Sequence, residues 1–162
     1  MATKKTQTIK NAVANLGMVT EIKVDGCETP LRLDFSDKRF VNRLLHLCKR
    51  WENLADEIEA RFAETDTIED KFEKLIAQSD IEVDVLTQFK NDVDSAFGAP
   101  ITETLYGDCL PGVERYYGLF DVLTPYMLEY KRKEKALLDT VAEKYGSARI
   151  SKSTTKSASE NA

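Results

Sequence analysis

The sequence predicts an α+β fold that is mostly α-helical, with an N-terminal β-hairpin packed on about four helices, the last of them long. Two observations support this fold class. Apolar and polar residues alternate over residues 19–24 and 31–35, which is the two-residue period of a β-strand. Apolar residues recur at three- and four-residue steps through most of residues 38–145, which is the period of an amphipathic helix.

The chain length of 162 residues suits one domain with tails. We expect residues 18–145 to form a single globular domain with an extended C-terminal helix. Residues 1–17 are polar with a weak amphipathic pattern, and we expect a flexible lead-in or a short helix there. Residues 146–162 are rich in Ser, Thr, Lys and Ala without periodicity, which predicts a disordered tail.

The two alternating segments are expected to pair as an antiparallel hairpin. They run from Val19 to Val24 and from Leu31 to Phe35, and residues typical of turns, such as Gly26 and Pro30, lie between them. Because a two-stranded hairpin is marginally stable alone in water, its apolar side must pack on the helices that follow.

The first helix is expected to begin after Ser36, a suitable N-cap residue. Phe35 and Phe40 on either side of this cap have the spacing of a hydrophobic staple. From Phe40 one apolar stripe continues for more than six turns to Phe62, and the opposite face is charged.

Two shorter helices are expected next. The first carries Ile68, Phe72, Leu75 and Ile76 and ends near residues 79–80, where the second begins. The second carries an apolar stripe from Val85 to Phe97 and is stopped by Gly98 and Pro100.

An ordered connection over residues 98–112 is expected to lead into the last helix, with Pro111 in its first turn. Pro125 lies inside this helix and predicts a kink or a break near residues 121–124. The helix is expected to end near Tyr145 and Gly146, and its polar part beyond Met127 could pair with a copy of itself, giving a homo-oligomer.

The charge distribution excludes some classes of partner. The formal net charge of −5 includes basic ends, and residues 17–145 alone carry −10. Because nucleic-acid affinity comes mainly from neutralising phosphates, we expect no nucleic-acid binding by this region and a basic partner surface instead. The acidic residues are interpreted as spread among Lys and Arg. No apolar run suggests a signal peptide or a membrane span, so we expect a cytoplasmic protein with no membrane partner.

No set of residues in the sequence suggests catalysis, a metal site or a cofactor. His46 is the single histidine, which argues against triads and His-based metal sites. The three cysteines are widely spaced and without a CxxC pair, so we interpret them as reduced thiols. Cys48 lies on an apolar stripe, whereas Cys109 lies in a loop and is the only thiol for which an enzymatic role is considered. We therefore expect a protein that is not an enzyme.

Three tyrosines are candidate partner-binding residues, because tyrosine offers contact area at small entropic cost. They are Tyr106, Tyr116 and Tyr117. Since Tyr116 and Tyr117 must point about 100° apart on a helix, we expect one in the core and the other exposed to a partner.

Four short motifs resemble a known family. They are Leu33-Asp-Phe-Ser-Asp37, Val93-Asp-Ser-Ala-Phe-Gly98, Leu105-Tyr-Gly-Asp108 and the segment from Tyr116 to Pro125. This arrangement over about residues 18–130 resembles small tail-module proteins, of the tail assembly chaperone type, from phages and prophages of Gram-positive bacteria.

The resemblance implies a binding function without catalytic residues. A protein of this type would bind the tape-measure protein, the tail-tube protein or both during tail assembly, in the cytoplasm of the bacterial host. The alternative is a phage-encoded acidic inhibitor of a host defence or nucleic-acid-processing enzyme, whose surface would mimic DNA. The interpretation of the acids as spread rather than concentrated counts against this alternative.

Overall fold

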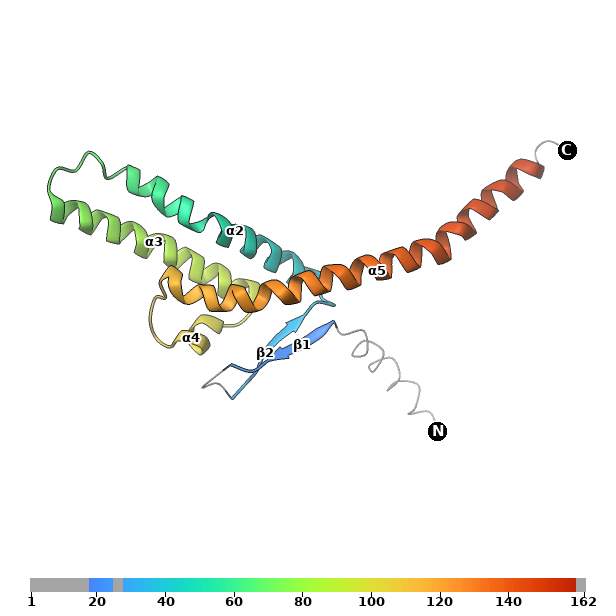
Figure 1. The fold of residues 1–162 in the computed structure, drawn as a ribbon, viewed down its shortest axis with the longest axis horizontal. Coiled ribbons are helices and arrows are strands. Elements are labelled where there is room, and N and C mark those ends of the chain that lie inside the picture. The colour runs from blue at the N-terminus through green and yellow to red at the C-terminus, as the bar shows by residue number, and fades with distance from the viewer. Residues whose placement is uncertain (1–17, 25–27, 160–162) are drawn as a thin grey trace. The chain divides into compact units, whose positions relative to one another are not determined.

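The computed structural model describes residues 18–24 and 28–159, with side chains described up to Gly146 (Figure 1). Our expectations for residues 1–17, and for the turn around Gly26, lie outside the described residues. Two strands come first along the described chain, followed by four helices, the last of them long. The mostly helical α+β fold with an N-terminal hairpin is therefore confirmed.

Contacts within the chain define two compact units, Met1–Phe120 and Asp121–Ala162. The first unit holds the hairpin, three helices and the first turns of the last helix. The second holds the remainder of that helix. The single domain expected over residues 18–145 stays a prediction.

Strands β1 (Val19–Ile22) and β2 (Leu31–Asp34) form the predicted antiparallel hairpin. Val19 lies opposite Asp34, and Ile22 opposite Leu31. The hairpin is fastened to the helices by the buried side chains of Leu33 and Phe35. The Phe35 ring packs edge-on against Phe40 at 5.9 Å, and Phe40 packs in turn against Phe97 at 5.8 Å.

Helix α2 (Lys38–Ala63) is capped by Asp37, so the prediction of Ser36 as the N-cap was wrong. The Asp37 carboxylate accepts a hydrogen bond from the Arg39 N–H at 2.9 Å. The Ser36 hydroxyl instead donates to the carboxylate of Asp34, so it belongs to the turn that leaves the hairpin. The contact between Phe35 and Phe40 forms even though the cap is one residue later.

Helix α3 (Lys71–Phe97) is a single helix where two were predicted. Asp70 caps it, accepting from the Glu73 N–H at 2.9 Å, and Gly98 ends it with φ 68°. Ser79 and Asp80 resembled a new start because both residues favour caps. Their weak preference costs little within a helix, and the helix continues through them to residues that pack in the core, such as Val85.

Helix α4 (Ile101–Tyr106) lies within the predicted ordered connection. It is anchored by Asp94 of α3, whose carboxylate accepts hydrogen bonds from both the N–H and the hydroxyl of the fully buried Thr102, each at 2.9 Å. The charged carboxylate thus accepts a hydrogen bond from a backbone N–H at the start of α4, a helix that is too short to be stable alone.

Helix α5 (Val113–Ser159) begins after Pro111, which therefore lies just before its first turn. The helix continues without a break through Pro125, where a kink or break was predicted. A proline removes one backbone donor, and the turns on either side hold the remaining bonds. The helix also passes the predicted end at Gly146 and includes residues for which we expected disorder.

An aromatic cluster forms the centre of the first unit. Trp51 of α2 stacks on Phe120 of α5 with ring centroids 4.7 Å apart and planes 6° apart. Phe89 of α3 meets Tyr116 edge to face at 4.9 Å. These contacts join three helices in one core, and large aromatic side chains bury much apolar area there.

Candidate interaction surface

Tyr116 and Tyr117 point in different directions, as the sequence predicted. Tyr116 is fully buried in the aromatic cluster. Tyr117 is 60% exposed, with one side of its ring edge-on to Trp51 at 5.3 Å. Tyr116 is therefore a core residue, and Tyr117 is the member of the pair that a partner could reach.

Tyr106 is half-buried at the end of α4. Its hydroxyl donates to the backbone oxygen of Arg115 at 3.0 Å, and its ring packs against Tyr116 at 5.7 Å. Burial raises the pKa values of both the Tyr106 and the Tyr116 hydroxyls. Tyr106 and Tyr116 thus pack against each other, and contact of any of the three tyrosines with a partner stays a prediction.

The two described thiols differ in their surroundings. Cys48 is half-buried on α2, where burial and, to a smaller extent, the charge of Glu52 raise its pKa to about 11. Cys109 is exposed, and its thiol donates to the Tyr106 carbonyl oxygen at 3.3 Å. Within the described residues, no three His, Cys, Asp or Glu side chains are grouped so that they could hold a metal ion. None of the helices, over the part that was described, is long and apolar enough to cross a membrane.

Charge is strongly separated along α2 and α3. Residues 38–51 contain five basic residues and no acid, whereas residues 52–84 contain twelve acids and three bases, a net charge of −9. Residues 52–84 cover the end of α2, the connection and the first half of α3, and we call this region the acidic tip. The acids are therefore concentrated, which corrects the interpretation that they are spread among Lys and Arg.

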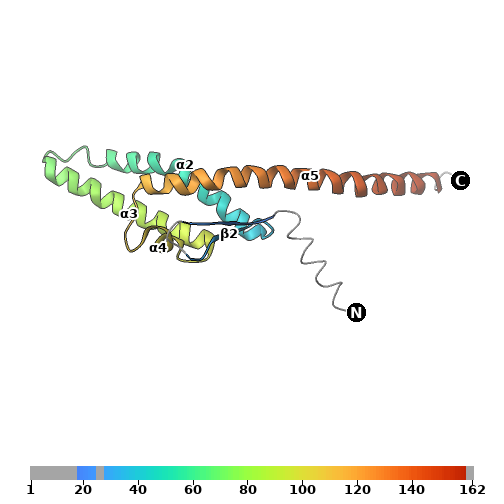
Figure 2. The same ribbon diagram turned by 60° about the horizontal axis from the view of Figure 1, so that its bottom comes forward.

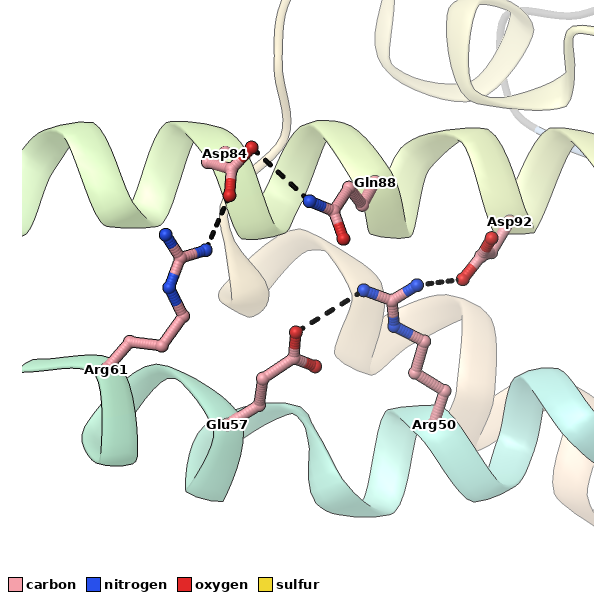
Figure 3. Close-up of polar contacts among 6 residues, drawn as sticks. All are labelled: Arg50, Glu57, Arg61, Asp84, Gln88 and Asp92. Atoms are coloured by element: carbon pink, nitrogen blue, oxygen red, sulfur yellow. Dashed lines mark hydrogen bonds and ion pairs between the residues drawn. The ribbon is translucent and has the colours of Figure 1, made fainter.

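Ion pairs link α2 to α3 within the acidic tip and just beside it (Figure 3). Arg50 of α2 lies between Glu57 of the same helix, at 3.5 Å, and Asp92 of α3. Arg61 of α2 contacts Asp84 of α3 at 2.5 Å, which lowers the pKa of that carboxyl group. All acids of the acidic tip except Glu57 are exposed, so its negative charge lies at the surface.

The first half of α3 carries an exposed apolar face, which sequence reasoning missed. Phe72 is 76% exposed, Leu75 59%, Ile76 58% and Val83 53%. Their spacings of three, four, seven and eleven residues place them on one side of the helix. We call these four residues the α3 face. Large exposed apolar side chains that are contiguous, unlike scattered ones, mark interaction sites.

The α3 face is exposed because the helices that cover the second half of α3 do not extend to it. Phe89 and Val93 are fully buried, and the Phe89 ring packs against residues of α5. The tip of α2 and α3 extends past the start of α5 in both orientations (Figures 1 and 2). The sequence showed a regular apolar stripe at Phe72. Periodicity alone does not indicate whether another helix covers such a stripe.

A pocket of about 340 Å³ lies where α2, α3 and the start of α5 meet, next to the α3 face. Three exposed glutamates from the three helices line it together with apolar side chains, and we call it the glutamate pocket. Its glutamates are Glu59, Glu82 and Glu114, and its apolar residues are Ala55, Ile58, Leu86 and Val113.

The second unit has exposed apolar residues of its own along α5. Leu138, Val141 and Tyr145 follow one another at three- and four-residue steps and are all exposed. A stripe at this spacing is compatible with pairing between helices. Self-association through this part of the chain stays a prediction.

Comparison with known proteins gives no relative: no protein-family model, no curated protein and no solved structure matches this chain.

Proposed function

We propose that this chain is a phage tail assembly chaperone, or a closely related morphogenesis factor, that binds the tape-measure protein, the tail-tube protein or both during tail assembly. The observation that carries the proposal is the α3 face, an uncovered apolar surface on an otherwise well-packed unit. A chaperone of this kind needs such a surface, because it must cover apolar helix faces of its client until assembly.

The motifs that resemble the tail-module family contain residues that stabilise the fold more than residues of the α3 face. Gly98 supplies the left-handed residue that ends α3, and Phe97 packs against Phe40. Tyr106, Tyr116 and Phe120 belong to the aromatic packing of the first unit. The resemblance thus concerns residues that build the fold, while client binding would depend on the surface around it.

The proposed activity is binding alone, without a catalytic step or a cofactor, in the cytoplasm of the bacterial host. The test is co-expression of the tagged full chain with the tape-measure protein, and separately with the tail-tube protein, of the same phage genome. Retention of either protein after affinity purification is expected. An unrelated helical protein of similar size serves as the control, and failure to retain both tail proteins would contradict the proposal.

The concentration of charge favours a second candidate, an acidic inhibitor of a host defence or nucleic-acid-processing enzyme. The net charge of −9 over residues 52–84 would imitate a phosphate backbone at such an enzyme's binding groove. Inhibition should then be relieved by competing duplex DNA and by salt above about 0.5 M, where charges are screened beyond about 4 Å. A panel of phage-targeted host nucleases that all remain fully active would remove this candidate.

A further inference from the structure

We propose that the α3 face and the glutamate pocket together form a docking site for a basic amphipathic helix of another protein. In this arrangement the apolar side of the partner helix lies along the α3 face, and a Lys or Arg side chain from its flank reaches the glutamates. The inference rests on the proposed function, because it specifies the chemistry of the client segment that such a chaperone would bind.

The dimensions of the α3 face fit a helix. Phe72 and Val83 are eleven residues apart on one helix, which corresponds to about 16 Å or three turns. Helix-in-groove recognition uses anchors at spacings of three, four and seven residues, which match a stripe of this length. An extended segment would instead need an exposed sheet edge for its backbone, and α3 provides none.

The glutamate pocket supplies a place for an anchor at one end of the face. Glu82 and Leu86 line the pocket, and Val83 of the α3 face lies between them along the helix. The apolar side chains of Ile58 and Val113 give the pocket a surface for a buried aliphatic group. The Glu114 carboxylate lies close to Gly112, which also lines the pocket, so a cation could meet it there.

The negative charge of the acidic tip favours a partner segment with positive charge. The acidic tip carries net −9, and its exposed carboxylates include those of Glu73 and Asp80 on α3. An acidic helix would be repelled from this surface, while Lys and Arg on the flanks of an apolar stripe would be attracted. Long basic side chains also cover apolar area with their methylene groups while their charged ends meet carboxylates.

The surface is held in place before any partner arrives. At the turn between α2 and α3, the buried Thr65 donates to the Phe62 carbonyl oxygen at 2.7 Å and accepts from Gln78 at 3.3 Å. Lys74 of α3 contacts Asp66 at 3.1 Å. A preorganised surface loses less entropy on binding, which favours affinity.

The test uses the full chain and two synthetic peptides of about 18 residues, five helical turns. Both peptides carry Leu at three- and four-residue steps, and their flanks carry Lys in one and Glu in the other. We expect the Lys peptide to bind at least about tenfold more tightly in fluorescence anisotropy, which corresponds to about 1.4 kcal/mol. Leu75→Ser and Glu82→Lys should each weaken its binding by about tenfold or more.

Matched controls lie on the second unit, where Leu138 and Asp139 are also exposed. Leu138→Ser and Asp139→Lys should leave binding of the Lys peptide unchanged, and circular dichroism should show all four variants folded. Equal binding of the two peptides, binding of neither, or indifference to Leu75→Ser and Glu82→Lys would each overturn the docking site.

Other occupants give different results. If a second copy of the chain occupies the site, sedimentation of the protein alone will show a dimer that Leu75→Ser abolishes, and the inference is wrong. If a charged groove of an enzyme occupies it, binding of the enzyme will respond to Glu82→Lys and not to Leu75→Ser, which also overturns it.

The inference and the proposed function can fail separately. If the tape-measure protein is retained equally by the original chain and by Leu75→Ser, the chaperone function stands and the docking site is wrong. If neither tail protein is retained and the Lys peptide still binds as expected, the docking site stands and the chaperone function is wrong.

Discussion

Replacing Tyr116 with Phe should stabilise the protein, although it removes a polar group from the centre of the core. The Tyr116 side chain is fully buried, and its hydroxyl has no hydrogen-bond partner in the described part of the chain. In the unfolded state the same hydroxyl binds water. Folding therefore takes this group out of water without compensation, and Tyr116→Phe removes that cost while keeping the ring contacts with Phe89 and Tyr106.

The magnitude follows from the cost of burying an unpaired hydroxyl, which is about 1–3 kcal/mol in protein mutational data. The missing oxygen leaves a small gap, whose lost dispersion contacts cancel part of the gain. We expect the free energy of unfolding to rise by about 1 kcal/mol. For a protein of this size that is a Tm increase of about 2–4 °C.

Urea unfolding followed by circular dichroism measures the effect as a shift of the midpoint at constant m value. Tyr117→Phe is the matched control, since Tyr117 is the next residue and its side chain is mostly exposed. Its free energy of unfolding should stay within about 0.5 kcal/mol of the original. A loss of stability by about 1 kcal/mol in Tyr116→Phe would show that the hydroxyl is satisfied and would refute the reasoning.

Three further predictions concern stability and thiol chemistry. Phe89→Ala should lower the free energy of unfolding by about 3–5 kcal/mol, because Phe89 is fully buried, whereas Phe72→Ala on the same helix should change it by less than about 0.5 kcal/mol in urea titrations. Gly98→Ala should cost about 1 kcal/mol from its positive φ alone, because no atom outside Gly98 and its two neighbours in the chain lies within 4 Å of the added methyl group. A neutral result in the same titration would contradict this. Because burial raises the pKa of Cys48 from 9.0 to about 11, its thiolate is scarcer at pH 8 in the folded state. Its higher nucleophilicity offsets part of this loss, so iodoacetamide should modify Cys48 about tenfold more slowly than in urea-unfolded protein; equal rates in a Cys-specific peptide map would contradict this.

Periodicity was sufficient to predict the hairpin, the long first helix and the long last helix. Each depends on many residues that agree, such as the alternation that places Leu33 inward and its neighbours outward. The burial of one of Tyr116 and Tyr117 followed from the same geometry. The prediction of the N-cap of α2 depended on a single residue and was wrong. Ser36 and Asp37 are both good N-cap residues, and only the turn after β2 decides between them.

The candidate surface could not be found from the sequence for a physical reason. Phe72 and Phe89 occupy the same helix with similar neighbours in the sequence, yet one is 76% exposed and the other fully buried. The difference comes from where α5 begins, and this depends on the length and path of the connection after α3. Tertiary contacts of this kind leave no trace in the local pattern of either residue.

The position of the charges explains how an exposed apolar face can persist. Two copies that met through their α3 faces would bring two acidic tips of net −9 together, and like charges so close repel strongly. The excess of carboxylates over residues 52–84 therefore opposes contact between copies while it attracts a basic helix. The apolar area of the α3 face supplies affinity for almost any apolar surface. The charge around this face therefore selects the partner.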